Sequence, residues 1–295
     1  MHPALKDFFK ALQSVTIYCF INSSNSIGLK IIVYSLSNIQ KYLNPLLPKT
    51  SMQISVIASG SNGNCCFVEE KDTSILIDAG KSCREIEERL NRLGKSLENL
   101  NAILLTHAHT DHVSGAGIIS RKYNIPIYLS KETFRETKSK IGDFERKTFN
   151  SNFNINNLNI TPIKTSHIIP SNGFIINKFG LFTDTGVITK ELADSIKHLK
   201  AVLIESNHDI DMLINGHYPP HLKQWILSDL GHLSNIDASN LIKEKGNHLS
   251  FILLGHLSGN NNTPEKAKET FETIVKNKLN YEVCSREKET GCWEI

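Results

Sequence analysis

The feature that most constrains this sequence is a cluster of metal-binding residue types directly after an apolar run. The stretch AILLTHAHTDHVSGA, residues 102–116, holds His107, His109, Asp111 and His112. Imidazole nitrogens and carboxylate oxygens are ligands of zinc-like divalent ions. The first two histidines can face one point from an extended turn, whereas the Asp–His pair opens the next helix and can face a second point. The stretch predicts a metal site where a buried strand passes into a helix.

The composition is that of an ordinary globular chain. Its 295 residues are 40% hydrophobic and 21% charged, which is enough to bury a sizeable core. The formal net charge of +3 neither requires nor excludes a polyanionic partner, because a local patch can still be basic. The six cysteines form no CxxC pair. We therefore expect reduced thiols in a cytoplasmic protein, and neither a disulfide framework nor a zinc–thiolate site.

The first 51 residues differ from the rest of the chain. They are moderately apolar, but no run reaches the ~20 apolar residues of a membrane-spanning helix. No clean cleavage site follows VTIYCFI, which argues against a signal peptide. We expect an N-terminal extension at 1–51, either an amphipathic segment or the product of a mis-assigned start upstream of Met52. One domain at 52–295, without a membrane anchor, follows it.

Beyond Met52 the hydrophobic pattern alternates between strand-like and helix-like segments, which indicates an α/β architecture. Strands are expected at 53–58, 65–70, 74–80, 102–106, 125–130, 173–186, 201–206 and 250–258. Helices are expected at 82–94, 111–124, 189–198, 219–231, 236–246 and 264–277. The stretch 131–165 is less regular, and its Asn-rich tract at 150–159 favours a long hairpin or loop.

Two metal ions need more ligands than the cluster alone supplies. His167 in IKTSHII, Asp184 in GLFTDTG and His256 in FILLGHLS each follow an apolar run. A strand delivers the residue after such a run to the rim of its sheet. We therefore count these three residues as further candidate ligands.

The order HxHxDH, then His, then Asp, then His resembles the metallo-β-lactamase superfamily over residues 52 to about 290. The resemblance implies an αββα sandwich with two metal ions at one edge. It implies one ion held by His107, His109 and His167, a second held by Asp111, His112 and His256, and Asp184 between both. Asp78 in LIDAG matches an acid that braces the ligand loop in this superfamily, although it also suits a turn former at the end of a strand.

This set of ligands predicts hydrolysis. Two divalent ions can share a water, lower its pKa so that a metal-bound hydroxide forms, and polarise a carbonyl or phosphoryl oxygen. All candidate ligands are His or Asp, so Zn²⁺ and Mn²⁺ are both compatible cofactors. The absence of a Cys ligand argues against the thiolate-bearing lactamase subtype. We expect His107→Ala or Asp111→Ala to abolish activity while leaving the fold intact.

Residues in the second half of the chain indicate which kind of bond is hydrolysed. Glu205 in LIESNHD and His232 in LGHLSN precede His256, an order that resembles the phosphodiesterase branch of the superfamily. That resemblance implies that Glu205 and His232 are catalytic together with Asp111, the pair supplying a proton to a leaving alkoxide. As alternatives, Glu205 could be a surface acid and His232 a helix cap.

The stretches MQISVIASGSNGNC, ESNHDIDMLINGHYPPHLKQWILSDLGHLSN and LLGHLSGNNNTPEKA resemble the bacterial YycJ/WalJ family, for which 5′-exonuclease activity on double-stranded DNA has been proposed. Two departures stand out. Gln224 and Trp225 occupy positions near which relatives tend to be basic, which would weaken a phosphate clamp. Ile168 stands where relatives often carry an aspartate, which could alter the surroundings of the neighbouring ligand.

Several residues are candidate substrate contacts. Ser61 and Asn62 lie in SGSNGN, which could cradle a phosphate or could simply form a hairpin turn. Ser234 belongs to the His-x-Ser sequence, and Lys223 is a candidate phosphate contact. Lys81 and Arg84 are similar candidates, although each could equally be a solvated charge.

The predicted function is therefore a dinuclear metal-dependent hydrolase, a phosphodiesterase or exonuclease-like nuclease acting on nucleic acid, DNA rather than RNA, with no obligate protein partner. The alternative is a thioester or lactone hydrolase of the glyoxalase II or lactonase kind, which would not need Glu205. A non-catalytic binding module would have lost ligands. A β-CASP nuclease would need a longer insertion between Asp184 and His256.

Overall fold

The computed structural model describes residues 18–21, 27–30, 51–276 and 278–295. The chain divides into two compact units, Met1–Thr50 and Ser51–Ile295. In the first unit, β1 (Tyr18–Ile21) pairs antiparallel with β2 (Ile27–Lys30). Among the described residues, no helix is both long and apolar enough to cross a membrane.

The second unit contains two seven-stranded sheets in its described residues. One has the order β16-β3-β4-β5-β6-β7-β8 and the other the order β15-β14-β13-β12-β11-β10-β9. The first sheet consists of β3 (Met52–Ala58), β4 (Cys65–Glu70), β5 (Thr73–Ile77), β6 (Ala102–Leu104), β7 (Ile127–Ser130), β8 (Arg146–Phe149) and β16 (Trp293–Glu294). The second consists of β9 (Phe153–Ile155), β10 (Leu158–Thr165), β11 (Ser171–Ile176), β12 (Phe179–Phe182), β13 (Ala201–Glu205), β14 (Phe251–Gly255) and β15 (Tyr281–Val283).

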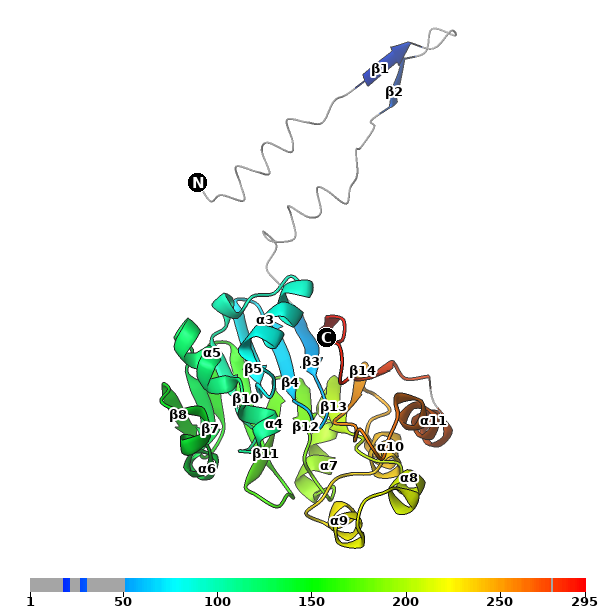
Figure 1. Ribbon diagram of the computed structural model, residues 1–295. Helices are drawn as coiled ribbons and strands as arrows, with labels where there is room; N and C mark the ends of the chain where they lie inside the picture. The colour runs from blue at the N-terminus through cyan, green and yellow to red at the C-terminus, as the bar shows by residue number, and fades with distance from the viewer. Residues whose placement is uncertain (1–17, 22–26, 31–50, 277) are drawn as a thin grey trace. The chain divides into compact units, whose positions relative to one another are not determined.

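Helices cover the outer faces of the two sheets (Figure 1). They are α3 (Cys83–Arg92), α4 (Thr110–Val113), α5 (Ala116–Tyr123), α6 (Lys131–Ile141), α7 (Lys190–Ile196), α8 (Ile210–Asn215), α9 (Pro220–Ile226), α10 (Asn235–Lys245) and α11 (Pro264–Val275), with a 3₁₀ turn at Leu97–Asn99. One buried cluster joins α3 and α5 to the first sheet, and another joins α7, α10 and α11 to the second. A third cluster lies between the sheets and includes Ile54, Val68, Phe174 and Leu253. The predicted αββα sandwich is confirmed.

Both sheets change from antiparallel to parallel pairing part of the way across. In the first sheet β5, β6, β7 and β8 run parallel, and in the second β12, β13, β14 and β15 do. The carboxyl ends of parallel strands meet at one edge of a sheet, and ligands characteristically bind there. The segments after β6, β12 and β14 carry the HxHxDH residues, Asp184 and His256, and Glu205 is the last residue of β13.

The expected helix at 111–124 is wrong as a single element, because it divides into α4 and α5. Gly115 separates the two helices and donates its N–H to Ala79 O at 2.8 Å. A Cβ at Gly115 would lie 2.2 Å from Lys81 O. The helix therefore breaks where its backbone packs directly against the loop after β5.

Two further expectations need correction. The helix expected at 219–231 ends at Ile226, because the chain turns back so that His232 N donates to Ile226 O. The stretch 131–165 contains α6, whose buried positions include Thr133 and Thr137, so it lacks an apolar periodicity. In the Asn-rich tract, β9 and β10 form a hairpin whose turn includes Asn156 at φ +49°.

Candidate metal centre

Neighbouring strands bring the candidate ligands together from distant parts of the sequence. In the second sheet Phe182 pairs with Ile204, and Glu205 pairs with Gly255. Asp184 and His256 follow β12 and β14, so this register places them at one edge, on either side of Glu205. His167 reaches the same edge from the loop between β10 and β11, and the HxHxDH loop arrives from β6 of the other sheet.

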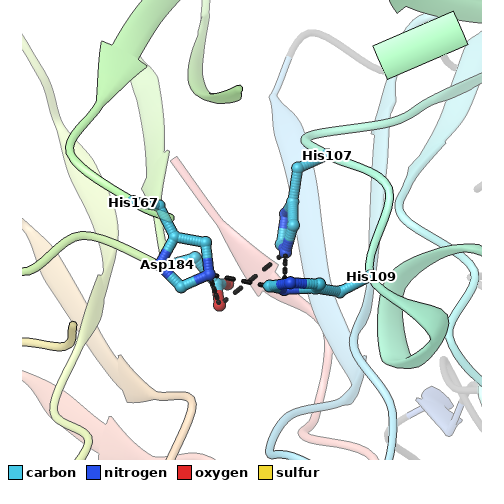
Figure 2. A group of neighbouring side chains, drawn as sticks. All are labelled: His107, His109, His167 and Asp184. Carbon is cyan, nitrogen blue, oxygen red and sulfur yellow. Dashed lines mark hydrogen bonds and ion pairs between the residues drawn. The ribbon is translucent and has the colours of Figure 1, made fainter. Parts of the chain in front are cut away.

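One group of side chains consists of His107, His109, His167 and Asp184, whose potential ligand atoms all lie within 4.8 Å of one another. Figure 2 shows the three rings and the carboxylate directed toward a common point. His109 Nδ1 lies 2.9 Å from His107 Nε2 and 3.3 Å from His167 Nε2. Asp184 Oδ1 lies 3.9 Å from His107 Nε2 and 3.7 Å from His167 Nε2.

A second group consists of Asp111, His112 and His256. His112 Nε2 lies 3.5 Å from Asp111 Oδ2, and His256 Nε2 lies 4.0 Å from the same oxygen. Asp184 adjoins this group as well, with Oδ2 3.3 Å from His112 Nε2 and Oδ1 3.7 Å from His256 Nε2. Asp184 is thus the one described carboxylate that lies within 4 Å of both groups of imidazoles.

Unsatisfied buried atoms at this centre fit a bound cation. Asp184 Oδ2 and His256 Nε2 are buried and make no hydrogen bond with the described residues. Leaving a buried polar atom unpartnered costs about 1–3 kcal/mol, and more for a charged group. Imidazole nitrogen and carboxylate oxygen are the donors that Zn²⁺ and Mn²⁺ accept. The residues present therefore fit divalent metal binding on both geometry and donor chemistry.

Three acidic or imidazole side chains at the centre have left-handed backbone conformations. Asp78, Asp184 and His256 have φ of +60°, +55° and +57°. Each stands directly after a strand or one residue further on. Such conformations cost of order 1–3 kcal/mol for residues other than glycine, and they cluster at functional sites. The sharp turn directs each side chain into the centre as its strand ends.

Asp78 orients one ring of the cluster. His112 Nδ1 donates to Asp78 Oδ2 at 2.7 Å, which leaves Nε2 for the second group of ligands. The backbone N–H of Thr106 donates to Asp78 Oδ1 at 2.9 Å, and the Thr106 hydroxyl lies 2.8 Å from Oδ2. Carboxylates that hold the far nitrogen of a ligating histidine are typical of metal sites.

Glu205 holds two imidazoles with one oxygen. His232 Nδ1 donates to Glu205 Oε1 at 2.8 Å, and His256 Nδ1 donates to the same oxygen at 2.6 Å. Oε2 accepts the backbone N–H groups of Thr185 and Leu233 at 3.0 and 3.2 Å. Glu205 is fully buried. Its pKa is lowered to about 2, because the charge and hydrogen bond of His232 outweigh the effect of burial.

The protonation states of the first group suit metal binding. Burial, together with the charge of His112, lowers the pKa of His107 well below its usual range. Burial and the charge of His167 lower the pKa of His109. The pKa of Asp184 is held well below its ordinary value, because the surrounding imidazoles outweigh its burial. Neutral imidazoles and ionised carboxylates are the forms that coordinate metal ions.

In the second group the pKa values of both imidazoles are raised and not lowered. The charge of Asp184 outweighs burial and raises the pKa of His112 well above its usual value and that of His256 to about 10. Hydrogen bonding to His112 lowers the pKa of Asp111 despite its burial. A cation that binds at this group must therefore displace protons from two imidazoles.

Asn64 is a neighbour of the centre that sequence reasoning missed. Its Nδ2 lies 3.0 Å from His112 Nε2 and 3.3 Å from Asp111 Oδ2, and its backbone N–H donates to Asp111 O at 2.8 Å. The Asn64 Oδ1 accepts from Gly60 N at 2.9 Å. The SGSNGN turn thus reaches the centre through its last residue. An Asn after a Gly at the end of a turn is the only signal for it in the sequence.

The predicted substrate contacts are only partly brought to the centre. Ser61 lines a cavity of about 260 Å³ over the metal centre, together with Trp225, His232 and other residues. Asn62 is exposed and is not among the residues that line this cavity. Lys223 Nζ donates to Ile214 O at 2.6 Å and to Gly216 O at 2.8 Å. Lys223 therefore ties α9 to the end of α8 and does not line the cavity.

The other candidates also have structural roles. Ser234 is the N-cap of α10 and forms a capping box with Asp237, so its hydroxyl is already engaged. Lys81 pairs with Glu85 at 3.6 Å. Arg84 pairs with Glu88, and its side chain is 89% exposed. None of these three basic or hydroxyl side chains lines the cavity over the centre.

Comparisons with known proteins agree with this geometry. The Metallo-beta-lactamase superfamily profile matches residues 58–190. The chain is 35% identical to the exodeoxyribonuclease WalJ of Streptococcus pneumoniae over 237 residues, covering 76% of this chain and 88% of that protein. It is 32% identical to the exodeoxyribonuclease YycJ of Bacillus anthracis, covering 77% and 90% of the two chains.

A solved structure gives the same fold. The metallo-beta-lactamase fold protein YhfI of Bacillus subtilis matches with a TM-score of 0.66 at 18% identity, over 84% of this chain and all of that one. These similarities confirm the fold and the expectation of a hydrolase. The chain belongs to the metallo-beta-lactamase superfamily and, within it, to the family of WalJ and YycJ.

Proposed function

We propose that this protein is a metal-dependent phosphodiesterase that removes nucleotides from DNA ends. The observation that carries the proposal is His232, which lines the cavity over the metal centre and is held through Nδ1 by the buried carboxylate of Glu205. Cleavage of a phosphodiester needs a proton for the departing alkoxide, because an alkoxide leaves badly. A thioester or lactone hydrolase has less need of such a donor.

The metal ligands are assigned as the sequence predicted. His107, His109 and His167 would hold one divalent ion, Zn²⁺ or Mn²⁺, and Asp184 would lie between this ion and a second. Asp111, His112 and His256 would hold the second ion. When bound, two such ions supply a nucleophile at neutral pH and stabilise charge on the phosphoryl oxygens.

His232 would supply the proton that the leaving group needs. In its imidazolium form His232 donates one N–H to Glu205, and the other, at Nε2, makes no hydrogen bond with the described residues. That second N–H would protonate the leaving oxygen. The Trp225 ring lies edge-on to His232 with centroids 5.4 Å apart, and both residues line the cavity. Trp225 thus contacts the proposed proton donor, near a position where relatives tend to be basic.

Two relatives support a DNA substrate. WalJ of Streptococcus pneumoniae and YycJ of Bacillus anthracis are named exodeoxyribonucleases, which favours DNA over RNA and an end over an internal bond. The four buried cysteines, Cys65, Cys66, Cys83 and Cys284, form no disulfide, which supports a cytoplasmic location. Burial raises the pKa of the Cys65 and Cys66 thiols, so neither is a reactive nucleophile.

The direct test is nuclease activity of the manganese-loaded protein on 5′-phosphorylated double-stranded DNA. Processive loss of nucleotides from the 5′ end, absent in His107→Ala, is the expected result. No cleavage by a protein shown to contain two metal ions would refute the proposal and favour a small thioester or lactone. Glu205→Ala cannot discriminate between these functions, because Glu205 also holds His256.

A further inference from the structure

A groove separate from the cavity over the metals begins at one of the metal-site histidines. It is lined by residues from the end of β7, the start of α6 and the loop between β10 and β11, and its volume is about 600 Å³. We call it the α6 groove, after lining residues that include Ser130, Lys131, Pro162, Lys164, His167 and Ile168. Nothing in the proposed chemistry requires it.

The α6 groove adjoins the metal centre at a single side chain. His167 lines both the groove and the cavity that contains His232 and Trp225. The groove has no lining residue from α9, which contributes Leu222, Trp225 and Ile226 to the cavity. A ligand held at the metals could therefore extend past His167 into the groove without displacing α9.

The charge of the groove favours an anion. Lys131 and Lys164 line it and are exposed. The acid among the lining residues is Glu132. Its one negative charge stands against the two positive charges of Lys131 and Lys164, so the lining keeps a net positive charge.

The apolar part of the groove includes Ile168, which stands where relatives often carry an aspartate. Ile168 follows a candidate ligand directly, lines the groove and is 53% exposed. Pro162, Ile169 and Pro170 line the same groove. Together these four side chains give the groove an apolar wall, which can pack on the flat face of a nucleobase or on a sugar.

The geometry points to a binding site for an unpaired DNA strand in the α6 groove, with Lys131 and Lys164 contacting backbone phosphates and Ile168 packing on a base or sugar. This inference rests on the proposed function and adds to it the path of the substrate beyond the scissile phosphate. A cavity of about 600 Å³ lies within the ~300–1,000 Å³ typical of small-ligand sites, so one or two nucleotides of a strand would fit in it. We therefore place an unpaired strand end, and not a duplex, in the groove.

The test measures binding and chemistry in the same preparation of metal-loaded full-length protein. Binding uses a fluorescent 5′-phosphorylated ten-nucleotide single strand with phosphorothioate linkages, titrated at several salt concentrations. The Lys131→Ala/Lys164→Ala variant should raise the Kd about tenfold at low salt. It should also reduce the slope of log Kd against log salt by about 1.4, since each phosphate contact on a single strand contributes ~0.7.

Two controls separate the groove from its surroundings. Lys138 lies on the same helix and Lys147 on β8, and neither lines the groove, so Lys138→Ala/Lys147→Ala should leave the Kd and the slope near those of the parent. Ile168→Ala should raise the Kd while leaving the slope unchanged, because it removes an apolar contact and no charge. Hydrolysis of bis(p-nitrophenyl) phosphate, too small to need the groove, should be equal in the parent and the two double-lysine variants.

The outcomes distinguish the groove from the proposed function. If the Lys131/Lys164 variant matches the Lys138/Lys147 control in Kd and slope while the small ester is still cleaved, the groove assignment is overturned and the phosphodiesterase stands. If the variant weakens binding of duplex DNA and not of the single strand, the unpaired strand is overturned. If the metal-loaded parent cleaves no phosphodiester, the proposed function fails, and the binding measurements still decide the groove.

Discussion

Replacing His232 with glutamine tests the proposed proton donor directly. His232 Nδ1 is one of the groups that donate to Glu205, and the donors from His256, Thr185 and Leu233 are untouched by the change. The carboxylate therefore remains satisfied, and the His256 ring keeps its orientation. The substitution should act on proton transfer without disturbing the fold or the metal ligands.

The expected effect depends on the leaving group. General acid catalysis by a positioned side chain contributes ~10²–10⁴-fold in rate, so His232→Gln should lower kcat on DNA about 10³-fold, or about 4 kcal/mol in activation free energy. A nitrophenolate leaves without protonation. The same variant should therefore lose less than about tenfold on a p-nitrophenyl ester of thymidine 5′-phosphate.

The assay compares kcat on the two substrates for the parent, His232→Gln and Glu205→Gln, with metal content measured for each protein. Glu205→Gln should impair both substrates and metal retention, because the Glu205 carboxylate also holds the ring of His256. Equal losses of kcat for His232→Gln on the two substrates would refute a role in leaving-group protonation. Full retention of DNA cleavage by this variant would do the same.

Three other predictions follow from the structure. His107→Ala and Asp111→Ala should each abolish hydrolysis with an unchanged circular dichroism spectrum, and full turnover in either variant would contradict the ligand assignment. Removing residues 1–51 should leave the thermal midpoint and activity of the remaining chain, Met52–Ile295, unchanged, and precipitation of the shortened protein would argue against this. His208 is buried, neither of its ring nitrogens makes a hydrogen bond with the described residues, and burial lowers its pKa to about 4. Because only the unfolded state binds this proton between pH 6.5 and 4, the free energy of unfolding should fall by about 3 kcal/mol as the pH drops through that window. Urea denaturation of His208→Leu should lack this component, and an identical pH dependence in parent and variant would count against it.

The general architecture could be predicted from the sequence because two signals agree. Apolar runs mark the buried strands, and the metal-binding residue types stand directly after those runs. Apolar runs such as those before His107 and His256 are buried strands, and a residue that follows a buried strand must emerge at its edge. The helix α6 escaped prediction because its buried positions include threonines, Thr133 and Thr137, whose hydropathy gives no helical period. Both hydroxyls are satisfied locally, Thr133 by Ser130 Oγ and Thr137 by the carbonyl of Thr133, so this polar face can be buried although its hydropathy does not indicate burial.

The supporting contacts of the centre were harder to predict than its candidate ligands. The bond from Glu205 to His256 joins residues that are 51 positions apart and depends on the parallel register of β13 and β14. Asn64 reaches His112 only because the turn before β4 packs on the loop after β5. Ser234 fits two interpretations of the sequence: its position after His232 suggests a substrate contact, and Ser-x-x-Asp also predicts the capping box that the structure has at the start of α10.

The left-handed backbone at Asp78, Asp184 and His256 has a consequence for how this protein can change over generations. Asp78 accepts from Thr106 and His112, so its carboxylate has a structural use. Glycine at Asp184 or His256 would remove both the backbone strain and a buried atom that makes no hydrogen bond with the described residues. Selection for stability alone would thus not retain these two side chains, and selection for function does. A descendant that has lost its activity should lose Asp184 and His256 early, before Asp78 and before the apolar strands that precede them.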